Sequence, residues 1–271
     1  MTADNSYDEK EFRRSVRRKT ARSFFFFFLF IALAFGGYRW LIRQPKDDGA
    51  LHPFRKVLDA NGRIFARSLS GNKKAPEYPR EKAVQNVRVN GDAGMTSELD
   101  PALWKLKLVR PSSGGPLVAE TLLISLDDIK ALPKTDVVFN FKCIEGWSQI
   151  TWWGGTRFSD FARRYSAGTK SGQVAHEKNH PEDFFKYAGL VTPDGEYYVG
   201  IDMASMMQSQ TILCYEMNGK PLPDNQGAPL RLIIPVKYGI KHLKRIGTIF
   251  FSDDPPPDYW AQRGYDYFAG L

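Results

Sequence analysis

A run of apolar residues near the N-terminus limits what this chain can fold into more than any other feature. Twelve apolar residues, Phe24 to Phe35, are followed by Gly36-Gly37 and a shorter stretch, Tyr38 to Ile42, which Arg39 interrupts. The whole run, about 18–19 residues, is long enough to cross a bilayer as one helix. Basic residues precede it within ten positions: Arg13, Arg14, Arg17, Arg18, Lys19 and Arg22. The positive-inside rule therefore predicts a cytoplasmic N-terminus, with everything after residue 43 outside the membrane.

Two further features leave other fates of this run open. Ala32-Leu33-Ala34 is a small-residue pattern at which a secretory signal could be cleaved. The paired arginines occur in signals of the route that exports folded proteins, although neither pair has the rest of that motif. A buried helix of a soluble protein is the third alternative. We expect an uncleaved single-pass anchor, and the position of the basic cluster before an apolar run gives no reason to expect a nucleic-acid partner.

The remaining chain divides by composition. We expect a basic cytoplasmic tail without regular structure over residues 1–23, the anchor over 24–42, a tether over 43–84 that packs partly on the domain, and a globular domain over 85–271. The chain is 42% hydrophobic and 14% aromatic, which is enough to bury a sizeable core.

Within the domain, the pattern predicts several strands and few long helices. Strands are expected at 87–91, 103–109, 122–124, 137–141, 184–191, 197–201, 230–235 and 247–251, with helices starting at Ser125 and Arg157 and a longer one over 202–216. We expect Gly154-Gly155 to form a turn, residues 166–183 to be an exposed insertion, and the aromatic C-terminal tail to wrap the surface. Because no βαβ rhythm appears, the fold class is α+β with mixed β-sheets and short helices.

One stretch, Phe141 to Phe161, contains the residues that are the strongest candidates for a reactive or metal-binding role. It holds Cys143, one of only two cysteines, just past the predicted strand 137–141. A cysteine there is most often a small buried hydrophobe, and a disulfide with Cys214 is possible in an oxidising compartment. Its charged neighbours Lys142 and Glu145 favour a reactive or metal-ligating thiolate, which Lys142 would stabilise. A single thiolate does not hold a transition metal alone, so any metal would arrive in a cofactor with its own ligands.

A second group of residues predicts an anion site. Gln226-Gly227-Ala228-Pro229 is a tight turn that leads to Arg231 at the start of a strand, and Gly239 is followed by Lys241, His242 and Lys244. Backbone N–H groups at glycine turns, together with Lys and Arg side chains, suit a phosphate. The simpler alternative is a solvated basic face.

Other metal motifs are weak or missing from the sequence. His176-Glu177-Lys178-Asn179-His180 matches the H-E-x-x-H pattern of zinc peptidases, but Pro181 and polar flanks speak against the helix that this motif requires. We interpret it as an exposed charged loop. The sequence contains no C-x-x-C pair for zinc or an iron–sulfur cluster, and no C-x-x-C-H for covalent haem.

Five segments, in this order, resemble the molybdopterin domain of the sulfite oxidase family over about residues 85–260. They are Lys142–Ser148 (K-C-x-E-x-W-S), Trp153–Phe161 (W-x-G-x-R-F-x-D-F), Asn218–Pro223 (N-G-x-x-L-P), Gln226–Leu232 (x-G-A-P-x-R-L) and Pro235–Lys244 (P-x-K-Y-G-x-K-x-x-K). The likeness is greatest to the periplasmic, sulfoxide-reducing branch of that family.

The resemblance implies a Mo-molybdopterin cofactor and a role for each matching residue. Cys143 would be the protein's ligand to molybdenum, and Tyr238 would lie near the substrate. Residues that would contact the pterin or its phosphate are Asn90, Thr192, Gln226, Arg231, His242, Leu243 and Lys244. Gln226 departs from the family, whose members often carry Asn or His there.

Taken with the resemblance, the sequence predicts a molybdenum-dependent oxidoreductase that transfers an oxygen atom outside the cytoplasmic membrane. The substrate would be a sulfoxide or another small oxo compound, and electrons would come from a separate protein, with a membrane haem protein as one candidate. We expect a monomer. The sulfite-binding arginines of true sulfite oxidases are not evident near Cys143, where Glu145-Gly146-Trp147 stand instead. Sulfite oxidation and a non-catalytic membrane-anchored binding module are the alternatives.

Overall fold

A computed structural model describes residues 4–68, 74–89, 91–96, 98–101, 103–112, 115–174 and 181–271, and among these it leaves undescribed the side chains of 4–8, 65–68, 112, 115–118 and 181. The chain forms two compact units, Met1–Lys56 and Val57–Leu271. Each is described by itself.

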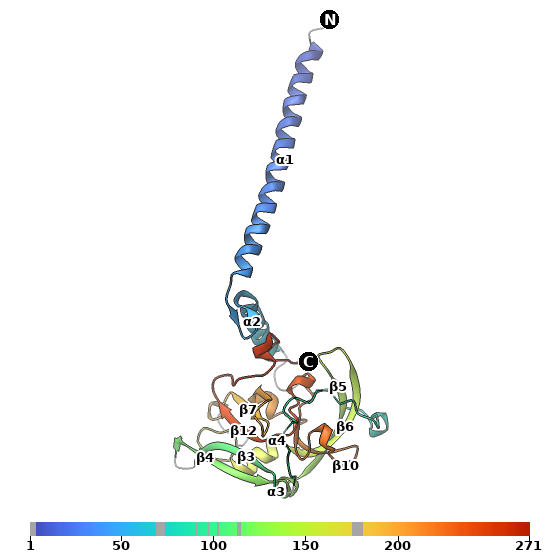
Figure 1. The fold of residues 1–271 in the computed structure, drawn as a ribbon, viewed down its shortest axis with the longest axis vertical. Helices are drawn as coiled ribbons and strands as arrows, with labels where there is room; N and C mark the ends of the chain where they lie inside the picture. The colour runs from blue at the N-terminus through green and yellow to red at the C-terminus, as the bar shows by residue number, and fades with distance from the viewer. Residues whose placement is uncertain are drawn as a thin grey trace. The chain divides into compact units, whose positions relative to one another are not determined.

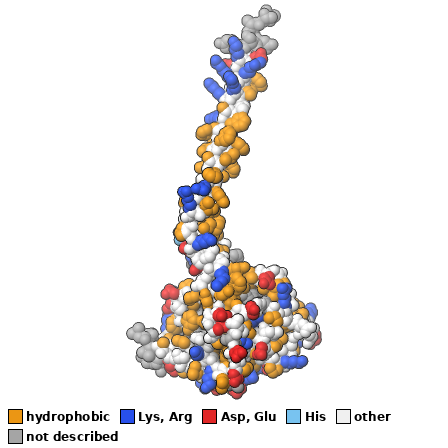
Figure 2. Space-filling model, viewed as in Figure 1, with side chains coloured by type: hydrophobic (Ala, Val, Ile, Leu, Met, Phe, Trp, Pro, Cys, Tyr) orange, Lys and Arg blue, Asp and Glu red, His pale blue; other side chains and the backbone are white. Residues whose placement is uncertain are grey.

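The first unit contains the apolar run predicted from the sequence. Helix α1 (Asp4–Ile42) includes a stretch, Glu9–Ile42, that is long and apolar enough to cross a membrane by length and composition. Figure 2 shows basic side chains toward the N-terminal end of this helix and apolar ones along the part that follows. The expectation of an irregular tail before the span was wrong for the described part, because the helix already begins at Asp4. A short hairpin follows, made of β1 (Lys46–Asp47) and β2 (Ala50–Leu51).

Two five-stranded sheets build the second unit (Figure 1). The first has the order β10-β9-β6-β5 with β11 also paired to β9; its strands are β5 (Lys134–Lys142), β6 (Ser148–Arg157), β9 (Ile212–Met217), β10 (Lys220–Pro221) and β11 (Arg231–Ile233). The second has the order β4-β3-β12-β7-β8; its strands are β3 (Lys105–Ser112), β4 (Gly115–Ser125), β7 (Tyr187–Val191), β8 (Tyr198–Asp202) and β12 (Thr248–Ser252). The pairing of β3 with β12 is parallel and the other pairings are antiparallel, so the predicted α+β class with mixed sheets is confirmed.

The described helices after α1 are short apart from α2, which has 17 residues and begins in the first unit. They are α2 (His52–Ser68), α3 (Leu126–Lys130), α4 (Phe158–Tyr165) and α5 (Met203–Met206), with 3-10 turns η1 (Arg80–Lys82), η2 (Pro181–Asp183), η3 (Asp224–Gln226), η4 (Gly239–Lys241) and η5 (Ala261–Arg263). Helix α3 begins as the sequence predicted, with Ser125 and Asp128 in a capping box. Helix α4 is the amphipathic segment predicted from Arg157 on, and its Phe158 and Phe161 are buried.

The first sheet is apolar on both faces, because the side chains of β9 belong alternately to two hydrophobic clusters. On β9, Leu213 and Tyr215 point into the main core that the second sheet and α4 share, whereas Ile212 and Cys214 point into a smaller cluster with Phe139, Phe141 and Trp153. Neighbouring residues of a strand face opposite sides of the sheet, which explains the alternation. The smaller cluster lies on the face that carries the candidate site.

Several sequence expectations were wrong. Residues 202–216 do not form one helix: Asp202 caps the four-residue α5, and the β-branched and aromatic run from Ile212 becomes β9. Gly154-Gly155 is no turn but a bulge inside β6, where Gly155 lies against β9. Residues 87–89 adopt no strand, and residues 167–169, within the predicted exposed insertion, are buried.

The segment predicted as a tether is more structured than expected. It contains the amphipathic α2, and from Ala75 on it crosses the first sheet. The Tyr78 N–H donates to the Val138 carbonyl at 2.9 Å, and the Val84 N–H donates to the Ile150 carbonyl at 3.0 Å. This crossing delivers Val87 and Arg88 to the candidate site.

Candidate active site

Cys143 lies where the sequence predicted, directly after β5. The chain turns there: the Cys143 N–H donates to the Trp147 carbonyl at 2.9 Å, and the Gly146 N–H donates to the Cys143 carbonyl at 3.1 Å. Gly146 has φ +90, a conformation that favours glycine. The turn links β5 to β6 and presents the cysteine at the end of the hairpin. Cys143 and Cys214 are both free thiols, so the possible disulfide is not formed.

The electrostatics of Cys143 differ from the expectation. Burial raises the pKa of its thiol and the Glu145 carboxylate adds to this, while the backbone N–H groups of Glu145 and Ile144 and the Arg88 guanidinium oppose the increase. Lys142 is exposed and is not among the causes. The protein alone therefore favours the neutral thiol, and a metal cation is the kind of charge that would convert it to thiolate.

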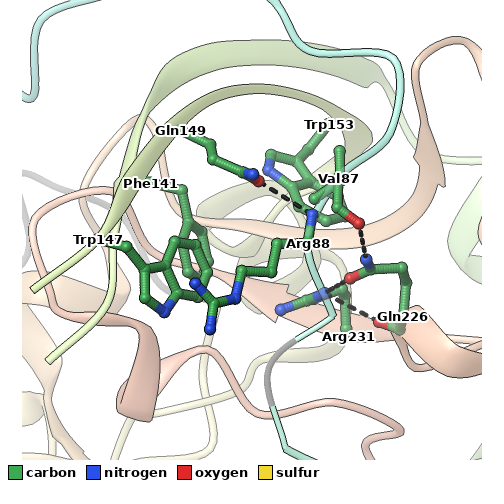
Figure 3. Close-up of a pocket in the computed structure, with 8 residues that line it drawn as sticks. All are labelled: Val87, Arg88, Phe141, Trp147, Gln149, Trp153, Gln226 and Arg231. Atoms are coloured by element: carbon green, nitrogen blue, oxygen red, sulfur yellow. Dashed lines mark hydrogen bonds between the residues drawn. The ribbon is translucent and has the colours of Figure 1, made fainter. Parts of the chain in front are cut away.

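A pocket opens beside this turn (Figure 3). Its lining residues are Val87, Arg88, Phe141, Trp147, Gln149, Trp153, Gln226 and Arg231. They come from the crossing segment, β5, the turn, β6, η3 and β11, so elements distant in sequence meet here. Phe141 and Trp147 flank Cys143 in sequence and stack at 5.9 Å between ring centroids. Both line the pocket, whereas Cys143, which lies between them in the chain, is not among its lining residues.

The rim of this pocket carries one positive and one negative side chain. The Trp147 indole N–H donates to Glu145 Oε2 at 2.9 Å, Arg88 Nη2 lies 4.0 Å from the same oxygen, and the Arg88 guanidinium lies 4.8 Å from the Trp147 ring. Figure 3 shows the Arg88 side chain extending over Trp147. Arg88 is a residue that the sequence did not reveal, because nothing local indicates that residue 88 crosses the sheet to reach residue 145.

At the deep end of the pocket lies Arg231, which is 1% exposed. Its Nη1 donates to the Gln226 carbonyl and side-chain oxygens, both at 2.9 Å, and its guanidinium lies 4.6 Å from the Trp153 ring. Its Nε is buried with no hydrogen-bond partner in the described structure, and no carboxylate of the described residues pairs with it. Burial lowers the pKa of Arg231 to about 10, which still leaves it charged at neutral pH. A buried cation without an anion is costly and marks an anion site.

Lys244 adds a second cation near Arg231. Its Nζ donates to the carbonyls of Gly91 at 2.9 Å and Asn225 at 3.3 Å. Burial and then the nearby positive charge of Arg231 together lower the pKa of Lys244 to about 8, against the opposing charge of Asp92. Gly227, at φ +102, holds the turn between them, and a Cβ there would lie 2.8 Å from the Lys244 Cβ. Arg231, Lys244 and the Gly227 turn, which the sequence predicted as parts of an anion cradle, thus lie close together.

Two other basic residues of the predicted cradle do not belong to it. Lys241 is paired with Asp258 at 2.5 Å, and Lys237, from the same segment, is paired with Asp202 at 2.7 Å. His242 is also held by the protein: its Nδ1 accepts from the Ile234 N–H at 3.4 Å and its Nε2 donates to the Lys237 carbonyl at 3.2 Å. Burial, then the charge of Arg231, lower the pKa of His242 to about 3, so the ring is neutral.

The remaining predicted cofactor residues have varied surroundings. Gln226 is buried and links Val87 to Arg231 through its side chain. Leu243 is buried, and its carbonyl accepts from the Leu232 N–H at 2.9 Å. The hydroxyl of Thr192 donates to Asp194 at 2.5 Å and accepts from the Tyr197 N–H at 3.1 Å, so it already holds a turn.

Of the predicted site residues that the structure describes, Gln226 and Arg231 line the pocket, and Cys143, Thr192, Tyr238, His242, Leu243 and Lys244 are not among its lining residues. Tyr238 is half-buried, its N–H donates to the Ala269 carbonyl at 2.9 Å, and its side chain is not among the pocket's lining residues. Asn90 lies outside the described residues, as do His176 and His180 of the H-E-x-x-H match. The described residues contain no cluster of three or more His, Cys, Asp or Glu that could hold a metal.

Comparison with known proteins gives this geometry a family. The description "Oxidoreductase molybdopterin binding domain" matches residues 93–260, which is more than half of the chain. The chain belongs to this family. It is therefore a molybdopterin-binding oxidoreductase, and the resemblance predicted from the sequence is confirmed.

Its relatives include sulfoxide reductase subunits. The chain is 33% identical over 201 residues to the putative protein-methionine-sulfoxide reductase subunit YedZ1 of Azospira oryzae, with 73% of this chain and 69% of the relative covered. It is 32% identical over 217 residues to the protein-methionine-sulfoxide reductase catalytic subunit MsrP of Xanthomonas axonopodis pv. citri, with 76% and 66% covered. The chain thus spans about two thirds of the length of these relatives. Among solved structures, the sulfane dehydrogenase SoxCD from Paracoccus pantotrophus matches with a TM-score of 0.46 and 17% identity, over 59% of this chain and 40% of that one.

The residues of the pocket fit the family's cofactor. Molybdopterin carries a phosphate. The buried Arg231, whose Nε has no hydrogen-bond partner in the described structure, is a cation that could bind this anion. Molybdenum accepts a soft sulfur ligand, and Cys143 lies in the turn whose Trp147 lines the same pocket. A candidate partner for the phosphate thus lines the pocket, and a candidate sulfur ligand lies in the adjoining turn.

Proposed function

We propose that this protein reduces sulfoxides, methionine sulfoxide in proteins among them, at a molybdenum centre held by Cys143. The observation that carries the proposal is the buried Arg231, which lines the pocket and which no carboxylate of the described residues neutralises. The buried Cys143 lies in the turn whose Trp147 lines the same pocket. The names of the relatives supply the substrate class.

Each residue of the pocket has a distinct part in this proposal. Arg231 and Lys244 hold the phosphate, and Gln226 keeps the Arg231 guanidinium in place through two hydrogen bonds of 2.9 Å. Cys143 gives up its proton and binds the metal as thiolate. The bound cofactor supplies a metal that exchanges an oxygen atom with the substrate in a two-electron step. Thr192, His242 and Leu243 are also proposed to contact the cofactor. Their main-chain N–H groups donate to the carbonyls of Tyr197, Gly239 and Lys241, so such contacts would replace hydrogen bonds within the protein.

The rim would handle protons and orient the substrate. Reducing a sulfoxide to a sulfide consumes two electrons and two protons and releases water. Glu145 is the carboxyl group of the rim, two residues from Cys143, so its Oε2 is the atom suited to hold a proton there. Trp147 offers an apolar face to the carbon substituents of the sulfur. Tyr238 would have to move to reach the substrate.

The proposed reaction needs an electron donor, and the compartment in which it takes place depends on how the chain is anchored. We propose that a separate electron-transfer protein reduces the metal, and that α1 anchors the chain in the cytoplasmic membrane with the domain on the outer side. The basic residues before the span support this orientation. Export with a cleaved signal remains the alternative, and we propose a monomer.

Sulfite oxidation is the second candidate, and one observation favours it. Arg88 lies at the rim next to Glu145 and lowers the pKa of the Cys143 thiol, so an arginine does stand near the predicted metal ligand. An anionic substrate would use that charge. Glu145 neutralises much of it, which is why we place sulfoxide reduction first.

The test is to express the full chain in a bacterium that makes molybdopterin and to purify it in detergent. We expect about one molybdenum per chain, and reduction of methionine sulfoxide with a reduced dye as electron donor. Cys143→Ser should abolish turnover and strongly reduce bound molybdenum, because the hydroxyl is a poor soft ligand.

Cys214→Ser is the matched control, since Cys214 is the other buried free thiol and stands opposite Arg231 on β9, in the smaller cluster. It should keep the metal and the activity. Full molybdenum-dependent turnover in Cys143→Ser would refute the ligand assignment, whereas sulfite-dependent dye reduction without sulfoxide reduction would favour the second candidate.

A further inference from the structure

The loop that carries Lys244 is attached to the C-terminal residues of the chain. This loop, residues 237–245, is called the basic loop below. The Leu271 N–H donates to the Val236 carbonyl at 3.0 Å, and the Tyr238 N–H donates to the Ala269 carbonyl at 2.9 Å. An antiparallel bridge joins Lys237 to Gly270. The last residues therefore run alongside the start of the basic loop as a short added strand.

Lys237 strengthens this attachment with its side chain. Its Nζ donates to the Phe268 carbonyl at 3.0 Å and to Asp202 Oδ2 at 2.7 Å, and it lies 3.1 Å from the centre of the Phe268 ring. The side chain is 2% exposed. One lysine thus ties the basic loop to the C-terminal segment and to the end of β8 at the same time.

Lys241, four residues later in the chain, attaches the basic loop a second time. Its Nζ donates to Asp258 Oδ2 at 2.5 Å and to the Gly200 carbonyl at 2.9 Å, and both partners of the ion pair are almost fully buried. The Tyr267 ring lies 4.5 Å from the same nitrogen. The tyrosine fits only because residue 200 is glycine: a Cβ there would lie 1.9 Å from the Tyr267 hydroxyl.

Beyond these two lysines, the basic loop turns toward Arg231. Arg231 Nη2 lies 3.5 Å from the His242 carbonyl, to which it donates, and the Arg245 N–H donates to the Gly227 carbonyl at 3.2 Å. Lys244 lies between these two contacts. The side chains at 237 and 241 therefore hold one part of the loop against the C-terminal segment, while residues 242–245 meet the anion cradle.

A gain in folding stability alone does not explain why Lys237 and Lys241 are paired with aspartates here. Two buried lysine–aspartate pairs are costly to desolvate, and well-packed apolar residues at such positions are often equally stable. A charged pair with several hydrogen bonds does, however, fix direction and distance more narrowly than apolar packing. The position of a loop matters most where it must meet a ligand with a fixed shape.

We propose that the segment Asp258–Leu271 is a positioning element for the cofactor, with Lys237 and Lys241 as the residues through which it holds the basic loop. The inference rests on the phosphate-binding part that the proposed function gives to Arg231 and Lys244. It extends the set of cofactor-determining residues to a segment that lies largely beyond the matched range 93–260.

The test uses Lys237→Met in the full chain, made in a cofactor-producing host and purified in detergent. Methionine keeps most of the volume but removes both hydrogen bonds of Nζ. We expect the purified protein to lose molybdenum and pterin during dialysis at least about fivefold faster than the unmodified chain, which corresponds to roughly 1 kcal/mol. In cofactor-free protein, hydrogen exchange of the peptide covering 236–245 should also be faster, while the β3–β4 peptides stay unchanged.

Three further variants make the outcome decisive. Leu106→Ala, on β3 of the second sheet and in the main core, should lower the unfolding temperature without accelerating cofactor loss. Phe268→Leu is the milder change if Lys237→Met does not fold, and it should show the same two effects more weakly. Arg231→Met tests the cradle itself.

The results separate the two proposals. If Arg231→Met retains the cofactor, the phosphate-binding part of the proposed function is wrong. If Arg231→Met loses it but Lys237→Met and Phe268→Leu lose it no faster than Leu106→Ala, the positioning element is overturned and the cradle stands. Faster exchange of the basic loop with unchanged cofactor retention would equally overturn the positioning element.

Discussion

Individual cations in this protein have different tasks, and their partners distinguish them. Lys237, Lys241 and Arg231 are all buried, yet the two lysines have aspartate partners and Arg231 has a nitrogen without any partner. Charge and spacing in the sequence indicated a basic cluster but could not divide it, because the aspartates lie at positions 202 and 258, far away in the chain. The unpaired buried nitrogen is the sign of the ligand-binding cation.

His242 allows a prediction about pH. Burial, then Arg231, lower its pKa to about 3 in the folded protein, while an unfolded histidine titrates near pH 6.5. Between these values only the unfolded chain binds the proton, so the free energy of unfolding falls as the pH drops. From pH 7 to 4.5 the unmodified chain should lose about 2 kcal/mol more than His242→Gln, measured by urea unfolding in detergent with tryptophan fluorescence.

Other buried bases do not disturb that comparison. Lys237 and Lys244 have folded pKa values of about 8, so below pH 7 both are charged whether the chain is folded or unfolded. Carboxylates lose their contribution in acid equally in both proteins. Parallel decreases of stability for the unmodified chain and His242→Gln would contradict the assignment of a neutral, buried ring.

At the scale of elements, the bulge in β6 decides how the first sheet fits together. A Cβ on Gly155 would lie 2.2 Å from the Leu213 carbonyl oxygen and 2.7 Å from the Cys214 Cα, both on β9. β9 in turn pairs with β11, and Cys214 of β9 stands opposite Arg231 of β11. The absence of a side chain at residue 155 thus supports the strand that carries the buried arginine.

Gly155→Ala should therefore separate β6 from β9. We expect a loss of at least about 2 kcal/mol, because backbone atoms cannot move aside as a flexible side chain can. In a thermal melt this is a drop of roughly 5 °C or more for a domain of this size. Gly37→Ala is the control, since no atom lies within 4 Å of the added group; equal melting of the two variants would show that the close approach is not real.

The elements also show which features were predictable from the sequence. Strand β5 with Cys143 at its end, the capped α3 and the amphipathic α4 were predicted because each has a local signal: an apolar run, Ser125 with Asp128, or helical spacing. Strand β9 was mistaken for helix because Met203, Met206 and Met207 have helical spacing, and only its pairing with β6 and β11 makes it a strand. Arg88 was missed for a related reason, since a long crossing segment brings it to the site.

At the scale of the whole molecule, the chain combines an apolar N-terminal helix with a domain that contains every described residue of the candidate site. Both sheets, Cys143 and Arg231 belong to the unit Val57–Leu271, whereas the candidate span belongs to the unit Met1–Lys56. The proposed chemistry and the proposed membrane attachment thus belong to separate parts of the chain. In a membrane, the orientation of the span would decide in which compartment the chemistry takes place.

The basic residues before the span predict that orientation. Arg13, Arg14, Arg17, Arg18, Lys19 and Arg22 precede Phe24, and such a cluster resists transfer across the membrane. In spheroplasts of cells that express the chain with an N-terminal epitope, added protease should destroy the domain and leave a protected fragment that carries the epitope. Replacing the six residues with glutamine should weaken this asymmetry. A domain that survives protease in intact spheroplasts but not after lysis would reverse the orientation, whereas an epitope that is lost from the membrane while the domain persists outside would show that the run is a cleaved signal.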